Sequence, residues 1–293
     1  MELRVLKYFL TVAREESITK AAQVLHVTQP TLSRQLMQLE EELNANLFVR
    51  GKRKIELTQE GMLLKRRATE ILDLTDKTER EFSESDGIVA GKIFIGGAET
   101  RTMQTLIQVM KDFCIEYPQV TYDMHSGNAD DIQERLEKGL IDVALLLEPV
   151  DIEKYEYIRL PQKEVRGLLM RKDSRLASKK TITPQDVKGL PLIHSNRIMV
   201  KKELSKWMKI DYEKLNIVAS YNLIYNAALM VEQGLGYASS LDNLVTTNED
   251  SLLCFRPFEP KLEIGTVIVW KKYQVFSPAT TKFIDQIKNA FKA

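Results

Sequence analysis

The sequence predicts an α/β protein that carries a small helical unit at its N-terminal end. Up to about residue 85, apolar residues recur every three or four positions, which is typical of helices. From residue 91 onward, segments typical of strands alternate with segments typical of helices. This alternation indicates βαβ units around a mostly parallel sheet. The chain of 293 residues is long enough for two or three domains.

The composition is that of a soluble globular protein, with 44% hydrophobic and 28% charged residues. A net charge of +1 does not by itself indicate a nucleic-acid or membrane partner. The first 16 residues lack the pattern of a signal peptide, and no stretch reaches about 18 consecutive apolar residues. We therefore expect a cytoplasmic protein with no membrane partner. Cys114 and Cys254 belong to no motif, so we expect two buried thiols, although the sequence alone does not exclude a disulfide.

Three helices are predicted at the N-terminus, over residues 3–15, 18–25 and 29–43. Ser17 is expected to cap the second helix and Thr28 the third, with Pro30 in its first turn. One stripe of leucines would bury the third helix against the other two: Leu32, Leu36, Leu39 and Leu43.

The remaining face of the third helix has an unusual polar composition. Most of its residues carry amide, hydroxyl or guanidinium groups, whereas a merely solvated helix face would more commonly consist of Glu and Lys. The residues are Thr28, Gln29, Pro30, Thr31, Ser33, Arg34 and Gln38. A major groove admits a helix, and such groups can pair with base edges there. We expect Gln29 to pair with adenine, and Pro30 and Thr31 to pack against a thymine methyl. Ser33 and Arg34 would hold phosphates or reach a guanine.

A basic hairpin is predicted directly after these helices, with strands at 48–50 and 54–57 around Gly51–Lys52. Between residues 50 and 67 there are seven basic and two acidic residues, a local charge of +5. The basic residues of the hairpin are Arg50, Lys52, Arg53 and Lys54. A basic loop beside a polar helix is the electrostatic footprint of duplex binding. Residues 1–58 are therefore predicted to be a winged helix-turn-helix domain that binds double-stranded operator DNA.

A long linker helix is predicted to follow, capped by Thr58 and extending over about 59–85 within a linker segment 59–87. Its heptad seam includes two threonines: Leu64, Ala68, Ile71, Thr75, Thr78 and Phe82. Because these threonines weaken the seam, pairing of this helix is not expected to be the sole source of dimer stability.

The C-terminal part is predicted to form two lobes, because its last strand and helix should return to the first sheet. The first lobe would comprise 91–161 and 266–293, and the second 162–265. Small ligands in such folds bind between the lobes, near strand ends and helix N-termini. The candidate ligand contacts are Thr100, Thr102, Asn128, His194, Ser195, Asn196, Tyr221 and Asn222. For Thr100, a simple helix cap is the alternative.

Residues 1–91 resemble the N-terminal region of LysR-type transcriptional regulators. The matching stretches are "FLTVAREESITKAAQVLHVTQPTLSRQLMQLEEELNANLFVR" and "LTQEG". The stretches "FCIEYPQV", "GLIDVALL" and "EQGLGYASS" resemble the effector domain of the same family, so the resemblance covers essentially the whole chain.

The resemblance implies a regulator that binds operator DNA and responds to a small-molecule effector in a periplasmic-binding-protein-like domain. It implies that Gln29, Pro30, Ser33 and Arg34 enter the major groove. It also implies an antiparallel homodimer through the linker helix and a homotetramer through contacts between the α/β domains. No enzymatic activity, cofactor or metal is implied.

Family analogy places Arg50 and Arg53 on backbone phosphates, with the minor groove as an alternative for Arg53. It likewise places Thr100 and Asn128 against the effector.

The charge of the effector depends on acidic residues near the predicted cleft. Glu148 stands where some relatives that sense aromatic acids have a cation, and Glu99 lies nearby. If both faced the cleft they would repel an anion, so we hypothesise a neutral or cationic effector with Glu148 among its contacts. Three arginines could neutralise these acids, so the sequence leaves the sign open: Arg101, Arg166 and Arg197.

A different class of protein is the main alternative: a cytosolic solute-binding protein or enzyme in which the helical region is only a dimerisation cap. Such a cap needs neither the basic hairpin nor the polar face from Gln29 to Arg34. His26 and His125 show no spacing typical of a metal site or a catalytic triad.

Overall fold

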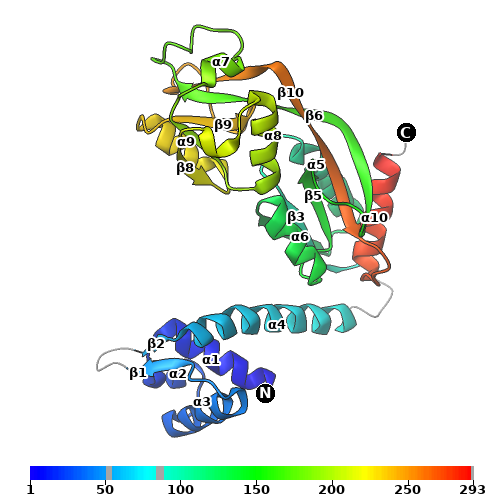
Figure 1. The fold of residues 1–293 in the computed structure, drawn as a ribbon. Helices are drawn as coiled ribbons and strands as arrows, with labels where there is room; N and C mark the ends of the chain where they lie inside the picture. The colour runs from blue at the N-terminus through cyan, green and yellow to red at the C-terminus, as the bar shows by residue number, and fades with distance from the viewer. Residues whose placement is uncertain (51–54, 84–88, 292–293) are drawn as a thin grey trace. The chain divides into compact units, whose positions relative to one another are not determined.

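The computed structural model describes residues 1–50, 55–83 and 89–291, with the backbone alone at residue 50 and at 80–83. The chain divides into two compact units, Met1–Ser85 and Asp86–Ala293, which are described separately (Figure 1). The predicted turn at Gly51–Lys52 lies outside the described residues, and so do Arg53 and Lys54.

The first unit has the predicted order of three helices, a hairpin and a long helix. Its elements are α1 (Leu3–Glu15), α2 (Ile18–Val24), α3 (Gln29–Leu43), β1 (Phe48–Arg50), β2 (Ile55–Leu57) and α4 (Gln59–Ser83). β1 and β2 pair antiparallel. The hydroxyl of Ser17 accepts from the N–H of Lys20, and that of Thr58 from the N–H of Gly61, which confirms two predicted caps.

The core of the first unit lies between α1, α3 and α4. Phe9, Leu32 and Leu39 are buried in it. Two predictions about apolar residues are wrong. Leu43 is 39% exposed, because α3 ends there and Asn44 turns the chain away in the left-handed region. Leu64 and Ala68 pack into this core, so the N-terminal half of the predicted seam is already buried within the chain.

The second unit is built on one eight-stranded sheet with the order β4-β3-β5-β10-β6-β9-β7-β8. The elements of its first part are β3 (Gly91–Gly97), α5 (Met103–Glu116), β4 (Val120–Ser126), α6 (Ala129–Glu137), β5 (Val143–Leu147) and β6 (Tyr155–Arg171). They are followed by α7 (Pro184–Val187), β7 (Leu192–Ser195), α8 (Ile198–Met208), the 3₁₀ helix Tyr212–Lys214, β8 (Ile217–Tyr221), α9 (Ile224–Glu232), β9 (Tyr237–Leu241), β10 (Leu253–Lys271) and α10 (Pro278–Ala290).

Two long antiparallel strands, β6 and β10, join the two halves of this unit (Figure 1). The sequence predicted only short strands near their ends, around 167–172 and 266–272. Their register shifts between Pro257 and Leu262 and again between Gly265 and Val267, close to the predicted lobe boundary at 265–266. Irregular pairing there bends the strands where one half of the unit passes into the other.

Separate apolar clusters stabilise the two halves. One packs α5 and α10 on the sheet around Phe113, Phe283 and Ile95. Another packs α8 on the sheet around Leu204, Trp207 and Phe258. This arrangement agrees with a two-lobe organisation, and the lobe boundaries themselves stay a prediction.

Within the described ranges, no helix combines the length and apolar character needed to cross a membrane. Cys114 and Cys254 are both free thiols. Cys254 is buried as predicted, whereas Cys114 is only half-buried.

Candidate functional sites

Helix α3 separates an apolar face from a polar one. Leu32, Leu36 and Leu39 are each at most 3% exposed and hold the helix on the core. The opposite face leaves six predicted DNA contacts exposed: Thr28, Gln29, Pro30, Thr31, Arg34 and Gln38. Ser33 is half-buried. The structure therefore brings together on one helix all seven predicted residues of the 28–38 stretch.

Local hydrogen bonds arrange part of this face. The hydroxyls of Thr28 and Thr31 lie 2.8 Å apart, so Thr28 occupies the N-cap position while its side chain bonds within the first turn. The amide of Gln35 donates to Oε1 of Gln38 at 2.8 Å. Across the part of the chain that the structure describes, the guanidinium of Arg34 has neither an ion pair nor a hydrogen bond, so its donors are available.

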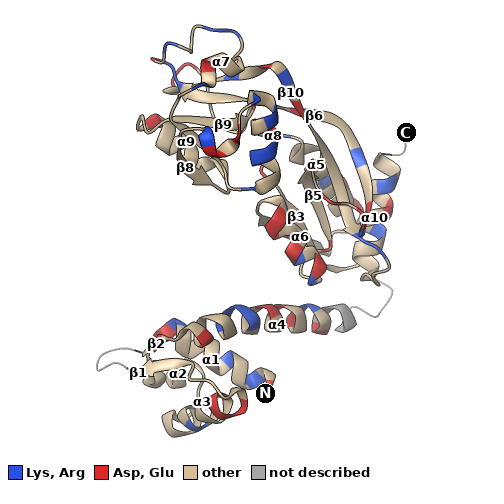
Figure 2. Cartoon of the chain, in the orientation of Figure 1, with Lys and Arg blue, Asp and Glu red and all other residues tan. Residues whose placement is uncertain are grey.

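One glutamate of α3 is used to position the hairpin. Oε1 of Glu40 accepts from the backbone N–H of Leu47 at 2.7 Å and from that of Phe48 at 3.3 Å. This carboxylate is thus turned toward the start of β1 rather than toward the exposed N-terminal end of α3. Acidic and basic residues along the helices are shown in Figure 2.

The predicted basic contacts of the hairpin cannot be placed with the same detail. Lys52, Arg53 and Lys54 lie outside the described residues, and only the backbone of Arg50 is described. Their role continues to rest on the local charge of +5 in the sequence.

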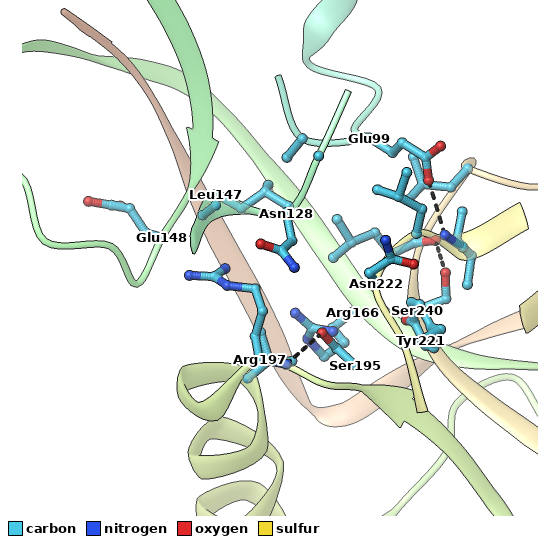
Figure 3. A pocket seen from close by; sticks show the side chains of 18 residues that line it. Glu99, Asn128, Leu147, Glu148, Arg166, Ser195, Arg197, Tyr221, Asn222 and Ser240 are labelled. Carbon is cyan, nitrogen blue, oxygen red and sulfur yellow. Dashed lines mark hydrogen bonds between the residues drawn. The ribbon is translucent and has the colours of Figure 1, made fainter. Parts of the chain in front are cut away.

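A cavity of about 80 Å³ lies in the second unit, where β6, β7, β8 and the starts of α6, α8 and α9 meet. Figure 3 shows this cavity from close by. Five of the predicted effector contacts line it: Asn128, Glu148, Ser195, Tyr221 and Asn222. Asn128 also caps α6, because its Oδ1 accepts from the N–H of Asp131 at 3.0 Å.

The other four predicted contacts do not line this cavity. Thr100 and Thr102 are buried and donate their hydroxyls to Glu164 of β6, and Thr100 instead faces a second cavity. His194 is fully buried, with Nδ1 3.2 Å from the carbonyl of Ser195, and burial lowers its pKa to about 3. Asn196 is exposed outside the cavity. These four side chains point away from the cavity that their sequence neighbours line. Short sequence patterns do not reveal the direction of a side chain.

Two arginines that the sequence offers only as possible neutralising charges also line this cavity. Arg166 from β6 is 6% exposed and Arg197 at the start of α8 is 7% exposed. Nε of Arg166 lies 3.1 Å from Oε2 of Glu203, and Nε of Arg197 lies 3.2 Å from Oδ1 of Asp130. One sequence feature could have identified Arg166 as a site residue: it directly precedes the apolar run "GLLM", which is typical of a buried strand. An arginine there is notable because arginine is rarely buried without a partner.

The acidic residues behind the hypothesis of a neutral or cationic effector already have partners. Oε1 of Glu148 lies 3.1 Å from Nε of Arg159, and in Figure 3 its carboxylate points away from the cavity. Oε2 of Glu99 accepts from the backbone N–H of Ile224 at 3.0 Å, at the start of α9. Both residues line the cavity, and both carboxylates have partners within the chain, so the charge of the effector stays a prediction.

The second cavity is larger, about 850 Å³, and lies beside α5 and α9. Its walls include the apolar side chains of Ile107, Met124, Tyr225 and Leu229, which are 41% to 70% exposed. Within the described residues, no group of three or more His, Cys, Asp and Glu side chains is placed to hold a metal ion.

Two family models match the chain. Residues 3–62 match the bacterial regulatory helix-turn-helix protein, lysR family, and residues 87–292 match the LysR substrate binding domain. The HTH-type transcriptional regulator YvbU of Bacillus subtilis is 32% identical over 239 residues, which cover 81% of this chain and 80% of that protein. The Hca operon transcriptional activator HcaR of Escherichia coli is 27% identical over 97% of this chain and 96% of its own.

Solved structures agree with the fold. The crystal structure of CbnR, a LysR family transcriptional regulator, superposes with a TM-score of 0.76 at 21% identity and covers the whole of both chains. Full-length CbnR complexed with its target DNA gives a TM-score of 0.72 at 22% identity, covering 99% of this chain and all of that one. With a helix-turn-helix unit and a substrate-binding unit that both match family models, the chain belongs to the LysR family of transcriptional regulators.

Proposed function

We propose that this regulator recognises its operator through the exposed face of α3. The observation that carries the proposal is the division of that helix: three leucines hold it in the core, while Gln29 and Arg34 are left exposed. Gln29 would read adenine, and the free guanidinium of Arg34 would contact phosphate or guanine. Thr28, Pro30, Thr31, Ser33 and Gln38 would complete the contact surface.

The basic hairpin would supply the attraction that does not depend on sequence. Arg50, Lys52, Arg53 and Lys54 concentrate positive charge beside a recognition helix whose own end carries Glu40, Glu41 and Glu42. Neutralising phosphates with such side chains releases counterions, so binding would weaken steeply as salt increases.

The cavity of about 80 Å³ is the proposed effector site. It collects polar groups from three helix starts and from the long strand β6, at the place where the two halves of the unit meet. A ligand there would contact both halves at once, and its binding would favour one relative arrangement of them. Asn128, Ser195, Tyr221 and Asn222 are the proposed contacts from the sequence.

Assembly would use two surfaces. Helix α4 exposes Met62, Leu63 and Leu74, at 57%, 54% and 43%, which suits pairing with a second α4 in a homodimer. The exposed apolar walls of the 850 Å³ cavity suit a contact between α/β domains, which would join two dimers into a tetramer. We expect the protein to act in the cytoplasm and without catalysis of its own.

A gel-shift titration of the full chain with the DNA upstream of its own gene tests this function. We expect a retarded complex at about 50 mM salt that weakens at about 200 mM. A scrambled duplex of equal length should bind more weakly. No retarded complex at low salt, in a preparation shown to be folded by its thermal transition, would contradict the proposal.

A further inference from the structure

Arg166 is a buried cation whose guanidinium is only partly engaged by the rest of the chain. Arg166 is 6% exposed and lines the cavity between the two halves of the second unit (Figure 3). Nε lies 3.1 Å from Glu203 but makes no hydrogen bond, and among the described residues the rest of the guanidinium makes none either. A guanidinium has five donors, and the ion pair with Glu203 involves only the Nε side of Arg166. The guanidinium donors that Glu203 does not engage are therefore available to a ligand in the cavity.

A second buried guanidinium lies at the same cavity. Arg197 is 7% exposed and precedes α8, and only its Nε is engaged, with the mostly exposed carboxylate of Asp130. Among the residues that the structure describes, no side chain caps the N-terminus of α8, an 11-residue helix, so its positive end adds to the charge of Arg197. The hydroxyl of Ser195 and the amide of Asn128 complete a set of donors around the cavity.

The acidic side chains near this cavity each have a partner within the chain. Glu99 and Glu148 are held by a backbone N–H and by Arg159. Glu203 is largely buried, and burial raises its pKa, while the neighbouring Arg166 opposes that shift. His194, also close by, stays uncharged because burial depresses its pKa.

The cavity walls are apolar beside these donors, with Leu147, Val200, Leu223, Ile224 and Leu241 among the lining residues. At about 10–15 Å³ for each water, 80 Å³ corresponds to about five to eight small-atom positions. The site therefore combines an oxyanion-binding end with a short apolar wall.

We propose that the effector is a small organic carboxylate whose oxygens are bound by Arg166 and Arg197, while its carbon chain lies against the apolar wall. This inference rests on the proposed effector site and adds the chemical class of its ligand. It replaces the hypothesis of a neutral or cationic effector. Planar guanidinium groups suit carboxylates because two parallel N–H donors match two oxygens.

Isothermal titration of the full chain with matched probes tests this class. Butyrate and malonate are compared with butyramide and malonamide, which have the same shape without the charge, and with inorganic phosphate and sulfate at equal ionic strength. We expect a carboxylate to bind and its amide to bind at least about tenfold more weakly, because charge-assisted hydrogen bonds are lost.

Variants locate the binding. Arg197→Gln, and the paired Arg166→Gln with Glu203→Gln, should each weaken carboxylate binding by about tenfold or more. The pair is changed together because Arg166→Gln alone would leave Glu203 buried without its cation. Arg175→Gln removes an exposed arginine in the same unit and should bind carboxylate as the parent chain does.

Equal binding of amides and carboxylates, binding of inorganic anions in preference to every carboxylate, or no carboxylate binding at all would each overturn the proposal. So would unchanged affinity in Arg197→Gln and in the paired variant. The gel shift without added ligand tests DNA binding independently of the titrations. A negative titration would therefore contradict the ligand class without contradicting the DNA-binding function.

Discussion

Glu164 of β6 accepts a hydrogen bond from the backbone N–H of Thr102 at 2.8 Å, across 62 positions of the sequence. The same oxygen accepts from the hydroxyls of Thr100 and Thr102. A carboxylate of the long strand thus occupies the N-terminal end of α5, where the helix dipole favours negative charge. Two predicted effector contacts are bound from within the chain instead.

Glu164→Gln should destabilise the second unit by about 1.5–3 kcal/mol, because a buried acceptor of charge-assisted hydrogen bonds becomes a neutral amide. Denaturant unfolding followed by tryptophan fluorescence measures this, since both tryptophans, Trp207 and Trp270, belong to that unit. Glu156→Gln changes an exposed glutamate of the same strand and should shift the free energy of unfolding by less than about 0.5 kcal/mol. Equal effects of the two variants would contradict a special role for Glu164.

Gln29→Ala should cost about 1–3 kcal/mol of binding at one base pair of the operator and little elsewhere. The physical reason is that an amide pairs with one base edge and contributes little to general attraction. Fluorescence anisotropy on operator duplexes, each with one base pair changed, measures the effect. An equal loss on operator and random DNA would rule out a reading role for Gln29.

Arg34→Ala should instead weaken binding to most duplexes and lower the slope of log affinity against log salt by about one. Its guanidinium has no partner within the described chain, so phosphate or guanine would be its natural acceptor. Salt titrations of binding to operator and random DNA provide the measurement. Arg175→Ala, which removes an exposed arginine of the other unit, serves as the matched control, and an unchanged slope in Arg34→Ala would count against phosphate contact.

The stability of the second unit should fall as the pH drops below about 6.5. His194 is fully buried and its pKa is lowered to about 3, so between these values the unfolded chain binds a proton that the folded chain does not. The stability that neutral His194 contributes is fully present above about pH 6.5. It is lost as the pH falls toward 3, and the free energy of unfolding decreases by up to about 1.4 kcal/mol per pH unit.

His194→Gln should flatten this pH dependence, measured by denaturant unfolding with tryptophan fluorescence between about pH 7 and pH 4. His26→Asn is the control, because His26 is exposed in the other unit and its left-handed backbone suits asparagine. An equally steep loss of stability in His194→Gln would assign the pH dependence to other groups.

The first unit was predictable almost residue by residue from local signals. Helix spacing and the caps at Ser17 and Thr58 act within a few positions, and they set the observed helices. The errors there arose from packing: Leu43 lies past the last contact of α3 with the core, and Leu64 is buried by α1 and its neighbours.

The second unit was predictable as alternating strands and helices but not as one sheet. The length of β6 and β10 was missed because charged and proline residues interrupt their apolar pattern around 161–166 and 257–263. Pairing with each other, rather than local propensity, keeps these segments extended.

By itself the sequence determined the family, the order of the elements and the polar face of α3, because all three depend on residue identity at short and regular spacing. Only the tertiary structure decided which side chains meet at the cavity that we propose as the effector site. Glu164 and Arg166 lie two positions apart on one strand, yet one carboxylate is used to hold α5 and the guanidinium lines the cavity. Sheet order and strand register set those long-range contacts, and neither can be read from neighbouring residues.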